Sequence, residues 1–297
     1  MSTFQRVNTE FRSQGLLCRA WHYQPSAASE AIIVMAHGLG GTRDAGLEPF
    51  AERFAENGYQ VLLFDYRHFG ASEGEPRQLL SISKQLEDWR AAVAHARQLP
   101  GVNPDKVGLW GTSFSGGHVI SIAANDPRIA AASAQGPMVD GLAAALNVVA
   151  YAGLGRLLKV SAYALADQTR ALLGMSPVTF PITAAPGEFA AMSSHDSLQY
   201  TDIVPPSWRN EMTARVMLTL ASYRPIAQVG KLKVPILVQA CMKDSVAPAP
   251  AAVKLAQKAG PLVELKQYDM GHFDIYVGED RETALRDQLA FFGRTLR

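Results

Sequence analysis

The sequence predicts an α/β fold, in which a mostly parallel sheet is covered by helices on both faces. Strand-like apolar runs alternate with helix-length segments through most of the 297 residues, as expected when each parallel strand is followed by a crossover helix. A hydrophobic content of 48% is enough to bury a large core. One interval, 137–230, breaks the alternation and holds seven of the 17 prolines, which indicates an insertion.

The predicted elements follow in order along the chain. Short segments around Phe4–Val7 and Leu16–Trp21 predict an antiparallel hairpin at the start of the sheet. Six apolar runs predict the remaining strands of an eight-stranded sheet: Ala31–Met35, Gln60–Phe64, Val107–Trp110, Ile129–Ala134, Ile236–Ala240 and Val263–Tyr268. The predicted helices are Ala45–Asn57, Leu80–Gln98, Phe114–Ala124, Ala249–Ala259 and Glu282–Thr295.

We therefore expect two kinds of structural unit. Residues 1–136 and 231–297 form the α/β core, and residues 137–230 form a helical cap inserted between two strands. Insertions in open α/β sheets tend to lie over the carboxyl ends of the strands, where ligands bind. The uncharged stretch Gly141–Gly155 is shorter than the about 20 apolar residues that span a bilayer, so we expect a buried or cleft-lining helix there.

Charge and cysteine usage exclude several classes of function. With 28 Lys and Arg against 27 Asp and Glu, a net charge of +1 gives no electrostatic basis for binding nucleic acid or an anionic membrane. Cys18 and Cys241 lie far apart and no histidines cluster near them, which argues against a disulfide framework and a metal site. The start of the chain has no basic and apolar leader pattern, so we expect a cytoplasmic protein.

The strongest catalytic signal is the segment Gly111-Thr112-Ser113-Phe114-Ser115, between a predicted strand and a predicted helix. A nucleophilic serine on a sharp strand-to-helix turn needs small residues two positions before and after it, because the backbone is strained and its neighbours pack closely. Gly111 and Ser115 meet that requirement for Ser113. Ser115 is the rival nucleophile, but its own neighbour two positions earlier is a serine.

A serine hydroxyl needs a base, and the base needs a carboxylate to orient it. His272 follows the last predicted strand, and Asp244 follows the strand before it, so the chain order is Ser, Asp, His. Asp269 and Asp274 are rival acids. They stand only two or three residues from His272, a separation at which a carboxylate rarely reaches the far ring nitrogen.

Two backbone N–H groups are also needed to stabilise the developing oxyanion. The first candidate is Phe114, directly after the nucleophile. The second is Leu39, in the glycine-rich turn Ala36-His37-Gly38-Leu39-Gly40-Gly41 that follows a predicted strand. A turn without a catalytic role, or a weak nucleotide loop, is the alternative for this segment, which lacks the full G-x-G-x-x-G spacing.

Taken together and in this order, the motifs resemble the α/β-hydrolase superfamily over essentially the whole chain. They are His37-Gly38, the run Asp65-Tyr66-Arg67-His68-Phe69-Gly70-Ala71-Ser72, the serine turn, Asp244 and Gly271-His272-Phe273. Many members have glycine where His68 stands. The sequence is most similar to the esterase, dienelactone-hydrolase-like or Xaa-Pro-peptidase-like branch with a helical cap, although a substrate does not transfer with a fold.

We therefore expect a serine hydrolase that acylates Ser113 from a small ester-like substrate, without metal or organic cofactor. The alternatives are a thioesterase, a peptidase or a C–C bond hydrolase with the same residues, and a ligand-binding protein without turnover. A homodimer is possible, and the sequence does not determine the oligomeric state. The candidate substrate-lining residues are large apolar side chains of the cap: Leu146, Tyr151, Met192, Trp208 and Met212.

Overall fold

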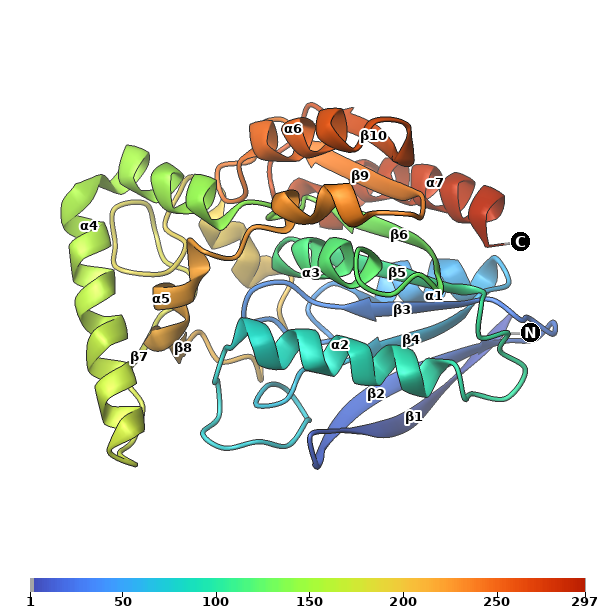
Figure 1. Ribbon diagram of the computed structural model, residues 1–297, viewed down its shortest axis with the longest axis horizontal. Helices are drawn as coiled ribbons and strands as arrows, with labels where there is room; N and C mark the ends of the chain where they lie inside the picture. The colour runs from blue at the N-terminus through green and yellow to red at the C-terminus, as the bar shows by residue number, and fades with distance from the viewer. Residues whose placement is uncertain (1–2, 297) are drawn as a thin grey trace.

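An eight-stranded sheet forms the centre of the protein, for which a computed structural model describes residues 3–296 (Figure 1). The strand order is β1-β2-β4-β3-β5-β6-β9-β10. β1 pairs antiparallel with β2, as does β2 with β4, and all other neighbours are parallel. The strands are β1 (Phe4–Ser13), β2 (Leu16–Pro25), β3 (Ile32–Ala36), β4 (Gln60–Phe64), β5 (Val107–Thr112), β6 (Ile129–Gln135), β9 (Ile236–Cys241) and β10 (Val263–Tyr268).

Helices cover both faces of this sheet. α1 (Glu48–Glu56) and α7 (Gly278–Thr295) lie on one face, where the rings of Phe54 and Phe292 meet with centroids 5.6 Å apart. α2 (Ile82–Ala96), α3 (Phe114–Ala123) and α6 (Ala249–Ala259) lie on the other. Because both faces are covered, β3, β4 and β5 are buried along their whole length and consist mainly of apolar residues. The predicted fold class is confirmed, and the opening hairpin is longer than predicted.

The segment between β6 and β9 is less helical than expected. It holds one long helix, α4 (Gly141–Leu172), a short helix α5 (Met217–Leu220) and a two-stranded sheet of β7 (Thr179–Phe180) and β8 (Met212–Thr213). The rest is irregular chain and 3₁₀ turns, since its prolines lack the N–H that a helix requires. Figure 1 shows this cap at one end of the sheet, on the left.

Helix α4 is longer and more exposed than a buried helix over Gly141–Gly155 would be. It runs to Leu172 and is kinked at Gly153, whose backbone is not helical (φ 79°, ψ 167°). Within residues 3–296 it is the one helix whose length and composition are those of a membrane span, and only 6% of its most apolar window is buried. Of the two expectations for this stretch, a buried helix is wrong, whereas a cleft-lining helix is confirmed, because Val148 and Tyr151 line a cavity between the sheet and the cap.

Three histidines are buried and uncharged at neutral pH. Burial lowers the pKa of His37 and of His68 to about 4 and that of His118 to about 3. The ring of His118 is held neutral between the Tyr223 hydroxyl, 2.7 Å from Nδ1, and the Gln85 side-chain oxygen, 3.0 Å from Nε2. His68 also has a φ of 74°, in the left-handed region where glycine is favoured.

These groups predict how stability depends on pH. Below the unfolded histidine pKa of about 6.5 the unfolded chain gains protons that the folded chain cannot, so the free energy of unfolding decreases as pH falls. Asp65 opposes this trend, because burial raises its pKa to about 6. Between about pH 6 and pH 4 its carboxyl group is therefore protonated in the folded protein but ionised in the unfolded chain. We expect a net loss on the order of 2 kcal/mol per pH unit from pH 6 to 4.5.

Urea unfolding at constant ionic strength measures this slope. His118→Gln removes one titrating group while retaining polar atoms for Tyr223 and Gln85, so its slope should be shallower than that of the wild type. Equal slopes for the two proteins would show that burial of His118 does not couple to folding.

Candidate active site

Ser113 occupies the turn between β5 and α3 with a strained backbone. Its φ is 55° and its ψ is −119°, a conformation that non-glycine residues adopt rarely. A Cβ added to Gly111 would lie 2.4 Å from the Ser115 carbonyl oxygen, and one added to Gly116 would lie 2.7 Å from Pro137 Cβ. Packing around the turn therefore requires glycine at both positions and holds the serine side chain toward the cap.

The side chains of Ser113, His272 and Asp244 form a continuous hydrogen-bonded chain. The Ser113 hydroxyl lies 2.9 Å from His272 Nε2, and His272 Nδ1 donates to Asp244 Oδ2 at 2.5 Å. The other oxygen of Asp244 accepts the N–H groups of Val246 and Ala247, each at 2.7 Å. Because both carboxylate oxygens are engaged and the side chain is only 2% exposed, Asp244 fixes the tautomer and orientation of the histidine ring.

The rival residues from the sequence lie elsewhere. Ser115 is fully buried on the far side of the turn, 2.8 Å from the Tyr66 hydroxyl. Asp269 is an exposed partner of Lys243, and Asp274 accepts the Gly271 N–H at 2.7 Å. None of the three contacts the His272 ring. The structure thus brings together one serine, one histidine and one aspartate from three strand ends.

Two backbone N–H groups lie beside Ser113. Gly38 is so close that an added Cβ would lie 2.9 Å from Ser113 Cβ, and the following residue, Leu39, lines the same cavity as Ser113. Phe114 begins α3, so its N–H has no partner within the helix. Among the described residues, neither N–H has an acceptor. Both N–H groups are therefore candidates for holding an oxygen anion at Ser113.

The cap supports the Leu39 loop from above. The Tyr200 hydroxyl donates to the Leu39 carbonyl at 3.1 Å, and Trp208 Nε1 donates to the Gly40 carbonyl at 2.8 Å. Tyr200 also stacks on Phe273, next to the histidine, with ring centroids 5.2 Å apart. These bonds fix the peptide planes of the loop and so the direction in which its N–H groups point.

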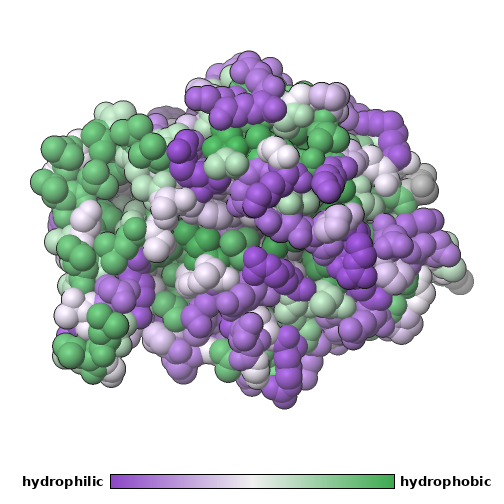
Figure 2. All heavy atoms as spheres, viewed as in Figure 1, coloured by the Kyte–Doolittle hydropathy of each residue, from purple (hydrophilic) through white to green (hydrophobic). Residues whose placement is uncertain are grey.

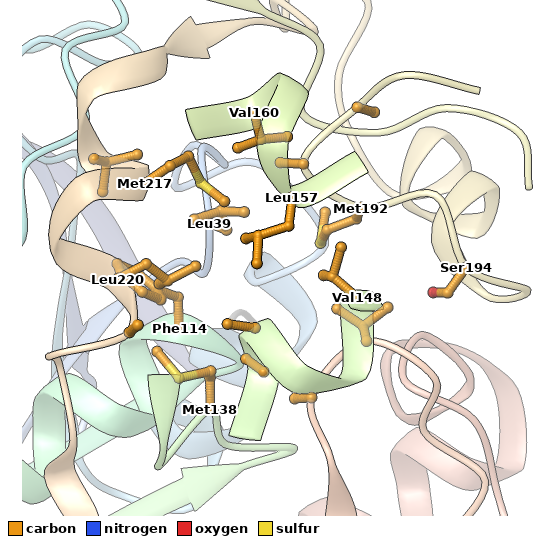
Figure 3. A pocket seen from close by; sticks show the side chains of 18 of the residues that line it. Leu39, Phe114, Met138, Val148, Leu157, Val160, Met192, Ser194, Met217 and Leu220 are labelled. Atoms are coloured by element: carbon orange, nitrogen blue, oxygen red, sulfur yellow. The ribbon is translucent and has the colours of Figure 1, made fainter. Parts of the chain in front are cut away.

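An apolar cavity of about 130 Å³ lies over Ser113, between the sheet and the cap (Figure 3). Its wall includes no charged side chain. The labelled residues of the wall come from the Leu39 loop, the Ser113 turn, the chain after β6, α4, α5 and the chain around Met192 (Figure 3): Leu39, Phe114, Met138, Val148, Leu157, Val160, Met192, Ser194, Met217 and Leu220.

The predicted substrate-lining residues divide into two groups. Tyr151 and Met192 line the cavity. Leu146 does not, because it is on the outer side of α4 and is 61% exposed. Met212 is fully buried in β8 and Trp208 donates to the Gly40 carbonyl, and neither side chain lines the cavity. The selection of Leu146, Trp208 and Met212 by size and apolarity alone was wrong.

The sequence matches the family described as serine aminopeptidase, S33 over residues 27–279. The chain belongs to this family. Its fold is that of the α/β-hydrolase superfamily, and the protein is an α/β-hydrolase enzyme.

Two curated relatives and one crystal structure illustrate the similarity. The quorum-quenching protein AidA of Acinetobacter baumannii is 43% identical, and the match covers 97% of this chain and 94% of AidA. The thiohydrolase aneE of Aspergillus aculeatus is 27% identical over 93% and 89% of the two chains. The α/β hydrolase GrgF from Penicillium sp. sh18 superposes with a TM-score of 0.84 at 26% identity, covering 98% of this chain and 99% of GrgF.

One residue of this hydrolase was missed by the sequence reasoning. Asp196, in the cap, accepts the backbone N–H of His272 and that of Ser245 on the same oxygen, each at 3.1 Å. Burial raises its pKa, but these two donors outweigh burial and lower the pKa overall. The neighbouring His195 has a side chain that is 91% exposed and lies 3.1 Å from the Asp196 carboxylate. The available signal was the polar run Ser193-Ser194-His195-Asp196 in an otherwise apolar insertion.

Proposed function

We propose that this hydrolase cleaves an ester-like acyl bond by forming an acyl-enzyme on Ser113, with His272 and Asp244 as the other members of a catalytic triad. The observation that carries the proposal is the Ser113–His272–Asp244 chain of hydrogen bonds at the base of an apolar cavity, at 2.9 and 2.5 Å. A hydroxyl, a base and an orienting carboxylate in this order are the parts that nucleophilic acyl transfer requires.

In the first half-reaction, Ser113 Oγ attacks the carbonyl carbon while its proton passes to His272 Nε2. Asp244 stabilises the imidazolium that forms, and the N–H groups of Leu39 and Phe114 hold the oxyanion. The imidazolium then protonates the leaving alcohol or thiol as its bond to the acyl carbon breaks. The products at this stage are the acyl ester of Ser113 and the released leaving group.

The second half-reaction repeats these roles with water. His272 accepts a proton from water, whose oxygen attacks the acyl carbon, and the second tetrahedral oxyanion occupies the same two N–H groups. Collapse of this intermediate returns the proton to Ser113 Oγ and releases the carboxylic acid. No step needs a group from outside the chain other than water and the substrate.

The cavity supports an apolar acyl portion. Its wall has no charged group, and at about 130 Å³ it is comparable to a cavity of about 150 Å³ that admits benzene. Relatives with the words thiohydrolase and polyketide transferase in their names are consistent with acyl groups carried on sulfur or oxygen. We infer a substrate with a short to medium aliphatic or small-ring acyl group. Comparing kcat/KM for esters, thioesters and lactones of one acyl chain length would identify the preferred leaving group.

Covalent labelling tests the nucleophile. A fluorophosphonate should label the wild type and Ser115→Ala at Ser113, whereas Ser113→Ala should take up no label and lose about 10³-fold or more in kcat. Thermal unfolding serves as the control for folding of both variants. Hydrolysis at the wild-type rate by Ser113→Ala would contradict the proposal.

A matched pair on α4 tests the cavity. Val148 lines the cavity, whereas Leu146 lies two residues earlier and faces solvent. Val148→Phe should fill part of the space and lower kcat/KM for p-nitrophenyl hexanoate by about 10-fold or more relative to the acetate, since each lost methylene contact weakens discrimination measurably. Leu146→Phe should leave the hexanoate-to-acetate ratio within about twofold. An unchanged ratio in Val148→Phe would place the acyl group elsewhere.

A further inference from the structure

The outer face of α4 is an exposed apolar surface. Leu154, Leu158, Leu165 and Leu172 recur at intervals of four, seven and seven residues, which places them on one side of a helix, with Ala162 and Leu173 beside them. These five leucines are between 58% and 79% exposed. Figure 2 shows hydrophobic residues gathered along the left edge of the molecule, where Figure 1 places α4.

The charged side chains of this half of α4 are all engaged elsewhere. Arg156 and Lys159 both reach the ring of Phe189, at 5.6 and 4.3 Å from its centroid. Asp167 is fully buried in an ion pair with Arg215, and Arg170 Nε donates to the Ser176 carbonyl at 2.7 Å. The outer face therefore presents mainly leucine and alanine side chains, with Thr169 between Leu165 and Leu172 and no charged side chain among them.

We propose that a second copy of this chain packs its α4 against this face, across a two-fold axis. At roughly 30 Å² per methylene, the five exposed leucines provide about 400 Å² of apolar surface. An interface about 60% apolar would then bury about 650 Å² on each copy, or about 1,300 Å² in total, which is within the roughly 1,200–2,000 Å² of specific interfaces. A two-fold contact brings the same stripe together with itself, and Ala162 near its middle permits close helix approach.

The charges favour a protein partner over a lipid surface. A helix that lies on a membrane attracts anionic headgroups with lysines and arginines beside its apolar face. In α4 the two cations nearest the stripe, Arg156 and Lys159, turn toward Phe189 instead. A second copy needs no such cations.

The proposed interface would also lie next to the substrate cavity, on the outside of α4. Leu157 and Val160 of α4 line the cavity, and Leu154 and Leu158 in the same turns are exposed to solvent. The cavity wall is thus one helix thick at this point, and pairing of two α4 helices would remove its outer side from water.

Sedimentation equilibrium at micromolar concentration tests the proposal. The wild type should have twice the chain mass of 32.1 kDa, and Leu158→Glu with Leu165→Glu should give the single-chain mass. Val277→Glu, at a residue that is 50% exposed on the core, is the matched control and should stay dimeric. A monomeric wild type, or a dimer that survives the double substitution, would overturn the proposal.

Disulfide trapping gives a second measurement that does not depend on folding of the glutamate variants. Cys18 and Cys241 are buried and burial raises the pKa of both thiols, so a new surface cysteine is the accessible one. Ala162→Cys should form a covalent dimer on mild oxidation, whereas Leu198→Cys should not. Absence of the covalent dimer, or sedimentation of a monomeric wild type with phosphatidylcholine vesicles, would count against a second copy as the partner.

A different observation concerns Asp196, which joins the cap to both triad loops. One of its oxygens accepts the N–H of His272 and the N–H of Ser245, the residue after Asp244. In return, the Ser245 hydroxyl accepts the Asp196 N–H at 3.1 Å and lies 3.0 Å from the Ser194 hydroxyl. Asp196 is 5% exposed and does not line the cavity.

We infer that Asp196 is a positioning residue that sets the distance between His272 and Asp244 by holding both backbones on one oxygen, an inference that rests on the proposed function. Asp196→Ala should lower kcat by about 10²-fold with KM unchanged, as expected when catalytic groups are displaced by about 1 Å. Asp196→Asn should recover most of the activity, because its carbonyl oxygen can accept both N–H groups.

Ser245→Ala is the matched control for a merely structural role. It removes the hydroxyl that accepts the Asp196 N–H and contacts Ser194, but it leaves the Asp196 carboxylate on both amides, so kcat should change by only a few fold. Rates are divided by the concentration of Ser113 that reacts with fluorophosphonate. An unreactive Ser113, which would count against the proposed function, is thereby distinguished from misplacement of His272 and Asp244, which lowers the rate per reactive serine. Wild-type kcat in Asp196→Ala, or an equal loss in Ser245→Ala, would overturn the inference.

Discussion

The strained backbone at Ser113 is the constraint on which the rest of the site depends. A residue at φ 55° persists only where its surroundings enforce it, and here glycines at 111 and 116 let Ser115 and Pro137 pack against the turn. The same close packing brings Gly38 against the serine, so the two N–H groups and the hydroxyl share one small volume. The strained backbone of Ser113 and the close approach of Gly38 are thus consequences of one packing arrangement.

The cap covers the site and also forms hydrogen bonds that hold the loops of the site in place. Tyr200 and Trp208 hold the carbonyls of the Leu39 loop, and Asp196 holds the amides of the two loops that carry His272 and Asp244. Together these bonds join the inserted segment to the ends of three strands, β3, β9 and β10. The position of the cap and the alignment of the reacting groups are therefore coupled through a few identified hydrogen bonds.

The sheet and the groups at its strand ends could be predicted because their signals are local. Apolar runs mark the parallel strands, and Ser113, Asp244 and His272 each directly follow one of them. The cap lacked such signals, since its chain is mostly irregular and its apolar residues serve three different surroundings: Met212 the interior, Met192 the cavity and Leu146 the solvent. Asp196 was missed because its partners are 49 and 76 residues away.

The most direct test of the account is the mass of the intact protein during turnover. Acid quenching of the enzyme within its first turnovers on p-nitrophenyl hexanoate should reveal a species heavier by one hexanoyl group in place of one hydrogen. Peptide mapping should locate this group on Ser113. A hexanoyl group on Ser115 or another residue, or turnover by Ser113→Ala at the wild-type rate, would contradict the proposed acyl-enzyme.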